Sequence, residues 1–152
     1  MMILLIGYGN DLRSDDGVGR QIADILSESN LPDLKTLSVH QLTPELSETL
    51  SEVDAAIFVD ASANPLTEVT ITPIKPLNSD FTLTHGWNPR SLLTLAQTLY
   101  GKSPNSWLVE IPAEDFSLGE NLSAIAEKGM IQALDRISLL IQEEILKNVS
   151  LL

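Results

Sequence analysis

The sequence contains no cysteine, and this absence excludes three kinds of chemistry. Disulfide bonds, thiolate metal sites and a cysteine nucleophile all require a residue that the chain lacks. Any metal ion must therefore be held by oxygen and imidazole ligands. Only two residues, His40 and His85, can supply imidazole.

Basic residues and long apolar runs are also scarce. Nine Lys and Arg residues stand against 21 Asp and Glu residues, so the formal net charge is −12. Nucleic acids and anionic membranes both attract clustered basic residues, and an acidic chain suits neither. The apolar run over residues 1–6 has no basic flank and is too short for a signal core, and no stretch approaches a membrane span. We therefore expect a soluble cytoplasmic protein that binds neither nucleic acid nor membrane.

Length and composition are those of one globular domain. The chain has 152 residues, of which 43% are apolar and 20% charged, which is enough to build a core. No internal repeat, low-complexity tract or linker-like shift in composition divides it. We expect a single domain over residues 1–152.

Apolar runs and helical spacing alternate along the chain. Short apolar runs predict strands, those at 2–6 and 54–60 being typical of strands buried on both faces. Ser14 or Asp15 is placed to cap the first helix, and Thr43 to cap the second with Pro44 at its first position. The predicted strands are 2–6, 34–39, 54–60, 68–74 and 106–111, and the predicted helices are 15–28, a short one from 43, 88–100 and 121–149.

The segment 68–74 differs from the other strands. It contains Pro73, which confines it to a sheet edge, and its connector from Asp60 is too short for a parallel crossover. It should therefore be an antiparallel edge strand. With right-handed crossovers elsewhere, the chain is predicted to be an α/β protein. Its doubly wound three-layer sheet should have the order 2-1-3-5-4, with strand 4 antiparallel at the edge.

Four polar residues converge on one rim of this predicted sheet. Asp16 follows strand 1, His40 closes strand 2, Asp60 ends strand 3, and His85 lies in the loop before the third helix. Ligands of such sheets bind outside the carboxyl ends of the strands. Two carboxylates and one imidazole, Asp16, Asp60 and His85, would form an open site for a divalent ion, with positions left for water or substrate.

Each candidate also has an ordinary structural explanation. Acids at a helix start, such as Asp15 and Asp16, complement the helix dipole by roughly 0.3–1 kcal/mol. Asp60 can end a turn that Ser62 caps, and a loop histidine often only packs. A charge at Asp60 is costly if it is buried and unpaired, and an acid at the carboxyl end of a central strand is a typical ligand or catalytic position, so we favour a functional role for this residue.

Other catalytic motifs find little support. Gly7-Tyr8-Gly9 resembles the start of the glycine-rich dinucleotide-binding fingerprint. However, Leu12 replaces the third glycine of that fingerprint, and the adjacent Asp15 and Asp16 would repel a pyrophosphate. We expect instead that both glycines allow a tight turn with positive φ. Neither the Gly-x-Ser-x-Gly elbow nor the His-Glu-x-x-His zinc motif is present.

Three motifs in register resemble the family of NiFe-hydrogenase maturation endopeptidases. The first is Gly7-Tyr-Gly-Asn-Asp-Leu-Arg-Ser-Asp-Asp-Gly-Val-Gly19. The second is Val59-Asp60-Ala61, and the third is His85 with Asn88-Pro89-Arg90-Ser91-Leu92-Leu93. The segment from Ile111 to Leu122 is also similar, so that the resemblance covers nearly the whole chain.

The resemblance implies a hydrolase activity that composition does not show. Family members remove a short C-terminal extension from the hydrogenase large-subunit precursor once nickel has been inserted. Their metal-binding acids and histidine correspond to Asp16, Asp60 and His85, and the first acid is often Glu, so that Asp16 is a shorter variant. The nickel would arrive with the substrate, no organic cofactor is expected, and Asp16 or Asp60 would act as general base of an aspartyl-type endopeptidase.

The segment His40-Gln41-Leu42 points to a branch of the family. It resembles the proteases that serve bidirectional, NAD-linked hydrogenases. We expect substrate contacts from this segment and from Asn10 and Arg13 on the same rim. Two alternatives remain open, namely a non-catalytic, metal-sensing chaperone for the same precursor and a nucleotide-binding domain.

Overall fold

A single mixed sheet organises the protein. The computed structural model describes residues 1–77 and 86–150. The sheet has the order β2-β1-β3-β5-β4; β4 is antiparallel to β5 and the other pairs are parallel. Both the order and the reversed edge strand confirm the prediction. The strands are β1 (Ile3–Tyr8), β2 (Leu34–Val39), β3 (Ala55–Ala61), β4 (Thr70–Ile74) and β5 (Asn105–Ile111).

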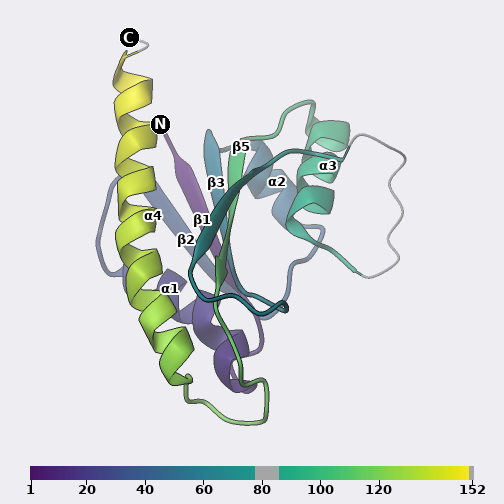
Figure 1. Ribbon diagram of the computed structural model, residues 1–152. Coiled ribbons are helices and arrows are strands. Elements are labelled where there is room, and N and C mark those ends of the chain that lie inside the picture. Colours follow the sequence, from purple (N-terminus) through teal and green to yellow (C-terminus); the bar gives the residue numbers. More distant parts are fainter. Residues whose placement is uncertain (78–85, 151–152) are drawn as a thin grey trace.

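Helices cover both faces of this sheet, which gives the predicted three layers. α1 and α4 lie on one face and α2 and α3 on the other (Figure 1). A short 3-10 helix, η1, precedes α1 directly. The helices are η1 (Ser14–Gly17), α1 (Val18–Ser27), α2 (Leu46–Ser51), α3 (Pro89–Tyr100) and α4 (Ala124–Ser150). Within residues 1–77 and 86–150, no helix is long and apolar enough to cross a membrane.

Side chains alternate between two hydrophobic cores along the central strands. In β1, Ile3 and Leu5 pack on the α1–α4 side, whereas Leu4 and Ile6 pack on the α2–α3 side. Tyr8 continues the second set and packs against it. Because successive residues of a strand point to opposite faces, this alternation also decides which way the polar residues at the strand ends point.

Glycines bring α1 unusually close to the sheet. A Cβ on Gly7 would lie 2.0 Å from the carbonyl oxygen of Gly19, and a Cβ on Gly19 would lie 2.3 Å from that of Val59. The expected positive φ is right for Gly9 (φ 145°) and wrong for Gly7, which lies within β1. The role of Gly7 is therefore to let a helix pack against the strand backbone.

The predicted start of α3 is confirmed, and that of α2 is wrong. Asn88 and Ser91 form a reciprocal capping box, in which the Asn88 side chain accepts from the Ser91 amide at 2.9 Å. Pro89 follows at the first helical position. α2 instead begins at Leu46 without a side-chain cap. Thr43 and Pro44 form a tight turn whose carbonyl oxygens accept from residues three positions later, which delays the first helical turn.

Candidate active site

Three polar side chains stand next to one another at the carboxyl ends of the central strands. Asp60 in β3 is paired in register with Glu110 in β5, and Gly7 of β1 is paired with Val59, which brings Tyr8 level with Asp60. Alternation puts Tyr8, Asp60 and Glu110 on the α2–α3 side. The sequence predicted Asp60, but neither Tyr8 nor Glu110. A charged residue inside the apolar run of β5 was the signal for Glu110.

The surroundings of Asp60 raise its pKa to about 7. Burial is the largest cause, and the negative charge of Asp16 is the next. Hydrogen bonds from the Tyr8 hydroxyl and the Ala61 backbone act in the opposite direction and are outweighed. A carboxyl group with this pKa can both accept and release a proton near neutral pH.

Tyr8 is the hydroxyl partner of Asp60. Burial, together with the negative charge of Asp60, raises the pKa of the Tyr8 phenol far above its usual value. The phenol therefore keeps its proton at any physiological pH and acts as a hydrogen-bond donor to Asp60. The strand end thus presents an acid whose orientation is held by a neutral neighbour.

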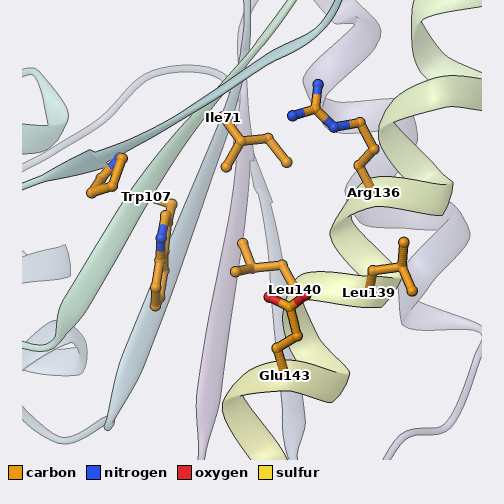
Figure 2. Close-up of a pocket in the computed structure, with 7 residues that line it drawn as sticks. Ile71, Trp107, Arg136, Leu139, Leu140 and Glu143 are labelled. Atoms are coloured by element: carbon orange, nitrogen blue, oxygen red, sulfur yellow. The ribbon is translucent and has the colours of Figure 1, made fainter.

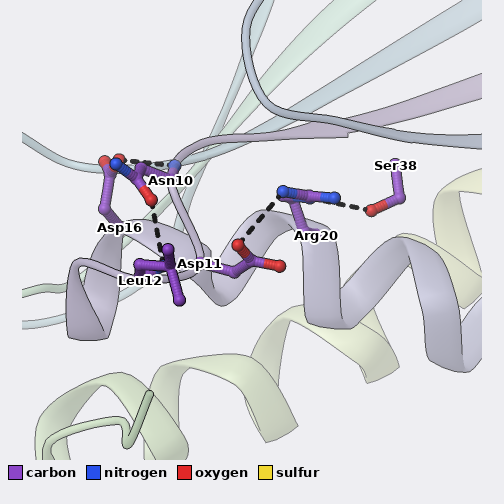
Figure 3. A network of polar contacts seen from close by, with 6 residues as sticks. All are labelled: Asn10, Asp11, Leu12, Asp16, Arg20 and Ser38. Atoms are coloured by element: carbon purple, nitrogen blue, oxygen red, sulfur yellow. Dashed lines mark hydrogen bonds and ion pairs between the residues drawn. The ribbon is translucent and has the colours of Figure 1, made fainter. Parts of the chain in front are cut away.

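Asp16 reaches the same rim from η1. Its Oδ2 accepts a hydrogen bond from the Asn10 amide at 2.7 Å (Figure 3). The turn that allows this contact needs glycine, since a Cβ on Gly9 would lie 1.9 Å from the Asp16 carbonyl oxygen. Asp16 lies close enough to Asp60 for its charge to act on the Asp60 pKa. The two aspartates predicted from different strand ends therefore lie within reach of each other's charge.

Polar contacts hold the loop that carries Asn10. Asn10 Oδ1 accepts from the Leu12 amide at 2.9 Å, and Asp11 forms an ion pair with Arg20 at 3.3 Å (Figure 3). Arg20 Nε also donates to Ser38 Oγ in β2 at 3.1 Å. The loop is thus tied to both α1 and β2, which orders it before any ligand arrives.

Asp15 has a role that the sequence did not predict. It is fully buried, and its carboxylate accepts from the amides of Glu114 (2.9 Å), Asp115 (3.0 Å) and Ser123 (2.7 Å) and from the Ser123 hydroxyl (2.7 Å). Burial alone would raise the Asp15 pKa, but these hydrogen bonds outweigh it and lower the pKa. The predicted capping of the first helix by Ser14 or Asp15 is wrong, because no side chain caps η1 or α1. Asp15 instead holds the loop that leads into α4.

The predicted substrate contacts fall in two different environments. Asn10 is half-buried and Arg13 is exposed in the loop after β1, while His40 and Gln41 are exposed just after β2. The two segments adjoin, because the Gly9 amide donates to the Val39 carbonyl oxygen at 3.2 Å. Leu42 is only 6% exposed and packs into the α2–α3 core.

His85, the third predicted metal ligand, lies outside the described residues. Among the residues that are described, no three acidic or histidine side chains form a group that would hold a metal ion. The triad of Asp16, Asp60 and His85 therefore stays a prediction.

A separate pocket lies away from this rim. It has a volume of about 320 Å³ and opens between β4, β5 and α4, where Ile71, Trp107 and Leu140 line it (Figure 2). Arg136, at its border, donates to the Val69 carbonyl oxygen at 2.6 Å. Ile71 and Trp107 pack on the α1–α4 side of the sheet. Asp60 faces the other side, so this pocket is not part of the candidate site.

Comparison with known proteins gives matches in three dimensions only. No family model and no curated protein matches the sequence. The hydrogenase maturating endopeptidase HybD from E. coli superimposes with a TM-score of 0.76 at 21% identity, covering 95% of this chain and 94% of that chain. The NiFe hydrogenase maturation protease HycI from Thermococcus kodakarensis KOD1 gives 0.72 at 24% identity, covering 93% and 92%. The hydrogenase 2 maturation peptidase from Thaumarchaeota archaeon SCGC_AB-539-E09 gives 0.67 at 20% identity, covering 93% and 98%. Over nearly its whole length, this chain has the fold of the NiFe-hydrogenase maturation proteases.

Proposed function

We propose that this chain is an endopeptidase that removes the C-terminal extension of a NiFe-hydrogenase large-subunit precursor after nickel insertion. One observation carries the proposal. Asp16 and Asp60 come from different elements, and burial together with the negative charge of Asp16 raises the pKa of Asp60, at the carboxyl end of the central strand, to about 7. Strongly shifted pKa values of this kind cluster at functional sites. The shared fold makes precursor processing the reaction to test first.

In this mechanism the nickel belongs to the substrate. The precursor would present its metal to Asp16, Asp60 and His85, so that only a loaded precursor docks productively. Carboxylate and imidazole groups suit such a borderline ion. The metal then serves as a recognition element and can polarise the scissile carbonyl group.

Asp60 is the general base in this proposal. It takes a proton from a water molecule as the water oxygen adds to the scissile carbonyl carbon, and it returns that proton to the leaving amine as the peptide C–N bond breaks. The hydroxyl of Tyr8 holds one side of the Asp60 carboxyl group during these steps. Asp16 would face the metal next to it.

The same proposal covers the partner and the compartment. Asn10, Arg13, His40 and Gln41 lie on adjoining exposed or half-buried loops of the rim and would contact the precursor. Leu42 would support this segment from the core. We propose a cytoplasmic reaction on the precursor of a bidirectional, NAD-linked hydrogenase, in line with the resemblance of His40-Gln41-Leu42.

The decisive experiment is to incubate nickel-loaded precursor with wild-type protein, Asp16→Ala, Asp60→Asn and the control Asp24→Ala, and to follow the precursor mass. Asp24 is an exposed acid of α1 and should be dispensable. We expect truncation by wild type and control, and a rate lower by about 100-fold or more for the two site variants. Nickel-free precursor should remain uncleaved.

Two outcomes would contradict the proposal. Tight binding of the loaded precursor with no change in its mass would identify a metal-sensing chaperone. Clear thermal stabilisation by NAD or ATP, without cleavage, would identify a nucleotide-binding domain, because a ligand of the native state raises its stability.

A further inference from the structure

We propose that Leu12, Phe116 and Leu118 form a docking surface, here called the loop-tip patch, for an apolar segment of the precursor flanked by basic residues. This inference rests on the proposed function and adds to it where and how the partner is held. The three side chains are 56%, 41% and 75% exposed, respectively. Single exposed apolar residues are ordinary, but here they come from two loops that are bonded to each other.

Backbone hydrogen bonds join the two loops. The Ser14 amide donates to the Gly119 carbonyl oxygen at 2.8 Å, and the Gly119 amide donates to that of Leu12 at 2.9 Å. The Ser14 hydroxyl donates to the Ser117 carbonyl oxygen at 2.8 Å. Figure 1 shows the loop between β5 and α4 lying beside the N-terminal segment that carries η1. The two loops that carry these side chains are therefore held together, although they lie about a hundred residues apart in sequence.

The same loop is anchored from below by Asp15. Its buried carboxylate accepts from the amides of Glu114 and Asp115 on one side of the patch and from Ser123 on the other. Asp16, the next residue, carries the negative charge that acts on Asp60 in the candidate active site. The patch and the site are thus connected through two consecutive residues, so a segment held on the patch is presented next to Asp16. A surface ordered in advance loses little conformational freedom on binding.

Charge around the patch indicates what the bound segment must carry. Asp11, Glu114, Asp115 and Glu120 are exposed on the two loops, where Arg13 is the one exposed base, so that acidic groups predominate around the patch. A neighbouring hollow of about 340 Å³ is lined by Glu120 and Glu127 together with Met130 and Ile131. An apolar centre within a polar, charged rim is the usual anatomy of a protein interface. Acidic groups around apolar ones fit a basic-flanked apolar segment and speed its encounter with the site.

A second copy of this chain is a poorer fit for the same surface. The chain carries a net charge of −12, and self-association through the patch would bring two acidic rims together. We therefore commit to the precursor as the occupant and treat self-association as an outcome of the test.

The test measures kcat, KM and direct binding of nickel-loaded precursor for Leu118→Glu, Leu12→Glu and the control Leu139→Glu. Leu139 is 58% exposed on α4, and it borders the pocket of Figure 2. We expect KM and the dissociation constant to rise about tenfold for each patch variant, with kcat within about twofold of wild type. The control should behave as wild type.

A charge variant provides a second readout that does not depend on the loop. Glu127→Lys lies on an exposed helical position and should raise KM several-fold at low salt, with the effect shrinking as salt is added. Thermal melting of every variant separates lost docking from lost folding. If Leu118→Glu fails to fold, Leu12→Glu and Glu127→Lys decide the matter.

The failures of the two proposals are distinguishable. If wild type cleaves the precursor and both patch variants bind and cleave like the control, the loop-tip patch is refuted and the proposed function stands. If wild type binds without cleaving, and the patch variants weaken that binding, docking is supported and the protease function fails. Absence of binding by wild type, or a dimer that Leu118→Glu dissociates without changing KM, would overturn the patch.

Discussion

Asp15 is fully buried and Asp60 is half-buried, and their pKa values move in opposite directions. Asp15, beneath the loop that leads into α4, has a lowered pKa although it is fully buried. Asp60, at the end of β3, has a pKa raised to about 7 by burial and by the charge of Asp16. Burial by itself therefore does not decide the direction in which the pKa of a carboxyl group shifts in this fold.

The difference lies in the neighbours. Asp15 accepts hydrogen bonds from three backbone amides and one hydroxyl, which stabilise its charged form. Asp60 has Tyr8 and the Ala61 backbone as donors, and it faces the negative charges of Asp16 and Glu110. Complete hydrogen bonding makes a buried carboxylate a structural anchor, while incomplete compensation leaves a group that exchanges protons near neutral pH.

Removing the buried carboxylate of Asp15 should have the largest effect on stability. Asp15→Ala leaves buried amides of Glu114, Asp115 and Ser123 without their acceptor, so we expect the free energy of unfolding to fall by about 3–5 kcal/mol at pH 7. Because the folded-state pKa of Asp15 is lowered, its stabilisation is present above the unfolded pKa and is lost as pH falls through the folded pKa. The deficit should therefore shrink in acid. Urea unfolding at several pH values measures it.

The matched control for that experiment is Asp24→Ala, which changes an exposed aspartate on α1. It should alter stability by no more than about 0.5 kcal/mol. A loss below about 1 kcal/mol for Asp15→Ala would mean that the loop finds other hydrogen-bond acceptors, and the contrast with Asp60 would disappear.

Replacing Asp60 should change the free energy of unfolding in the opposite direction, by stabilising the protein. Since the folded-state pKa of Asp60 is about 7, the folded protein holds a proton that the unfolded chain releases near pH 4. The charged form of Asp60 destabilises the folded state, and this destabilisation grows as pH rises from the unfolded-state pKa and is complete above the folded-state pKa. Asp60→Asn should therefore be more stable than wild type at pH 8, by up to about 4 kcal/mol, and equally stable near pH 4.

Stability and activity should separate in this variant, since the proposed base is gone. Thermal melts at pH 4 and pH 8, run beside the cleavage assay, measure both properties. If Asp60→Asn were no more stable than wild type at pH 8, the charged form of Asp60 would be better compensated than its surroundings indicate.

The smallest expected effect concerns Tyr8. Its hydroxyl lowers the Asp60 pKa from the value that burial and Asp16 alone would set. Tyr8→Phe should therefore move the acid limb of the pH profile of kcat/KM upward, by up to about one pH unit. Tyr100→Phe, at the exposed end of α3, is the control. A profile that stays in place would show that Tyr8 packs beside Asp60 without setting its pKa.

Local signals in the sequence predicted most of the fold. Pro73 and a short connector were enough to place β4 at the edge, and Asn88-Pro89 marked the start of α3 through its capping chemistry. Thr43-Pro44 resembled such a start but formed a turn, because helix caps and tight turns use the same residue types. Asp60 was recognisable as a candidate because it ends a buried apolar strand.

What sequence could not decide was how the neighbouring acids Asp15 and Asp16 divide their roles. Both stand at the start of one helix, and local rules assigned either of them to cap it or to face the site. The sequence by itself determined the order of the strands and the rim that carries Asp16 and Asp60, since alternation and connector length are local properties. Only the tertiary structure turned Asp15 toward the loop about a hundred residues away and set Tyr8 and Glu110 beside Asp60. The physical reason is that hydrogen-bond donors and neighbouring charges that shift a pKa come from segments distant in sequence, and only packing brings them together.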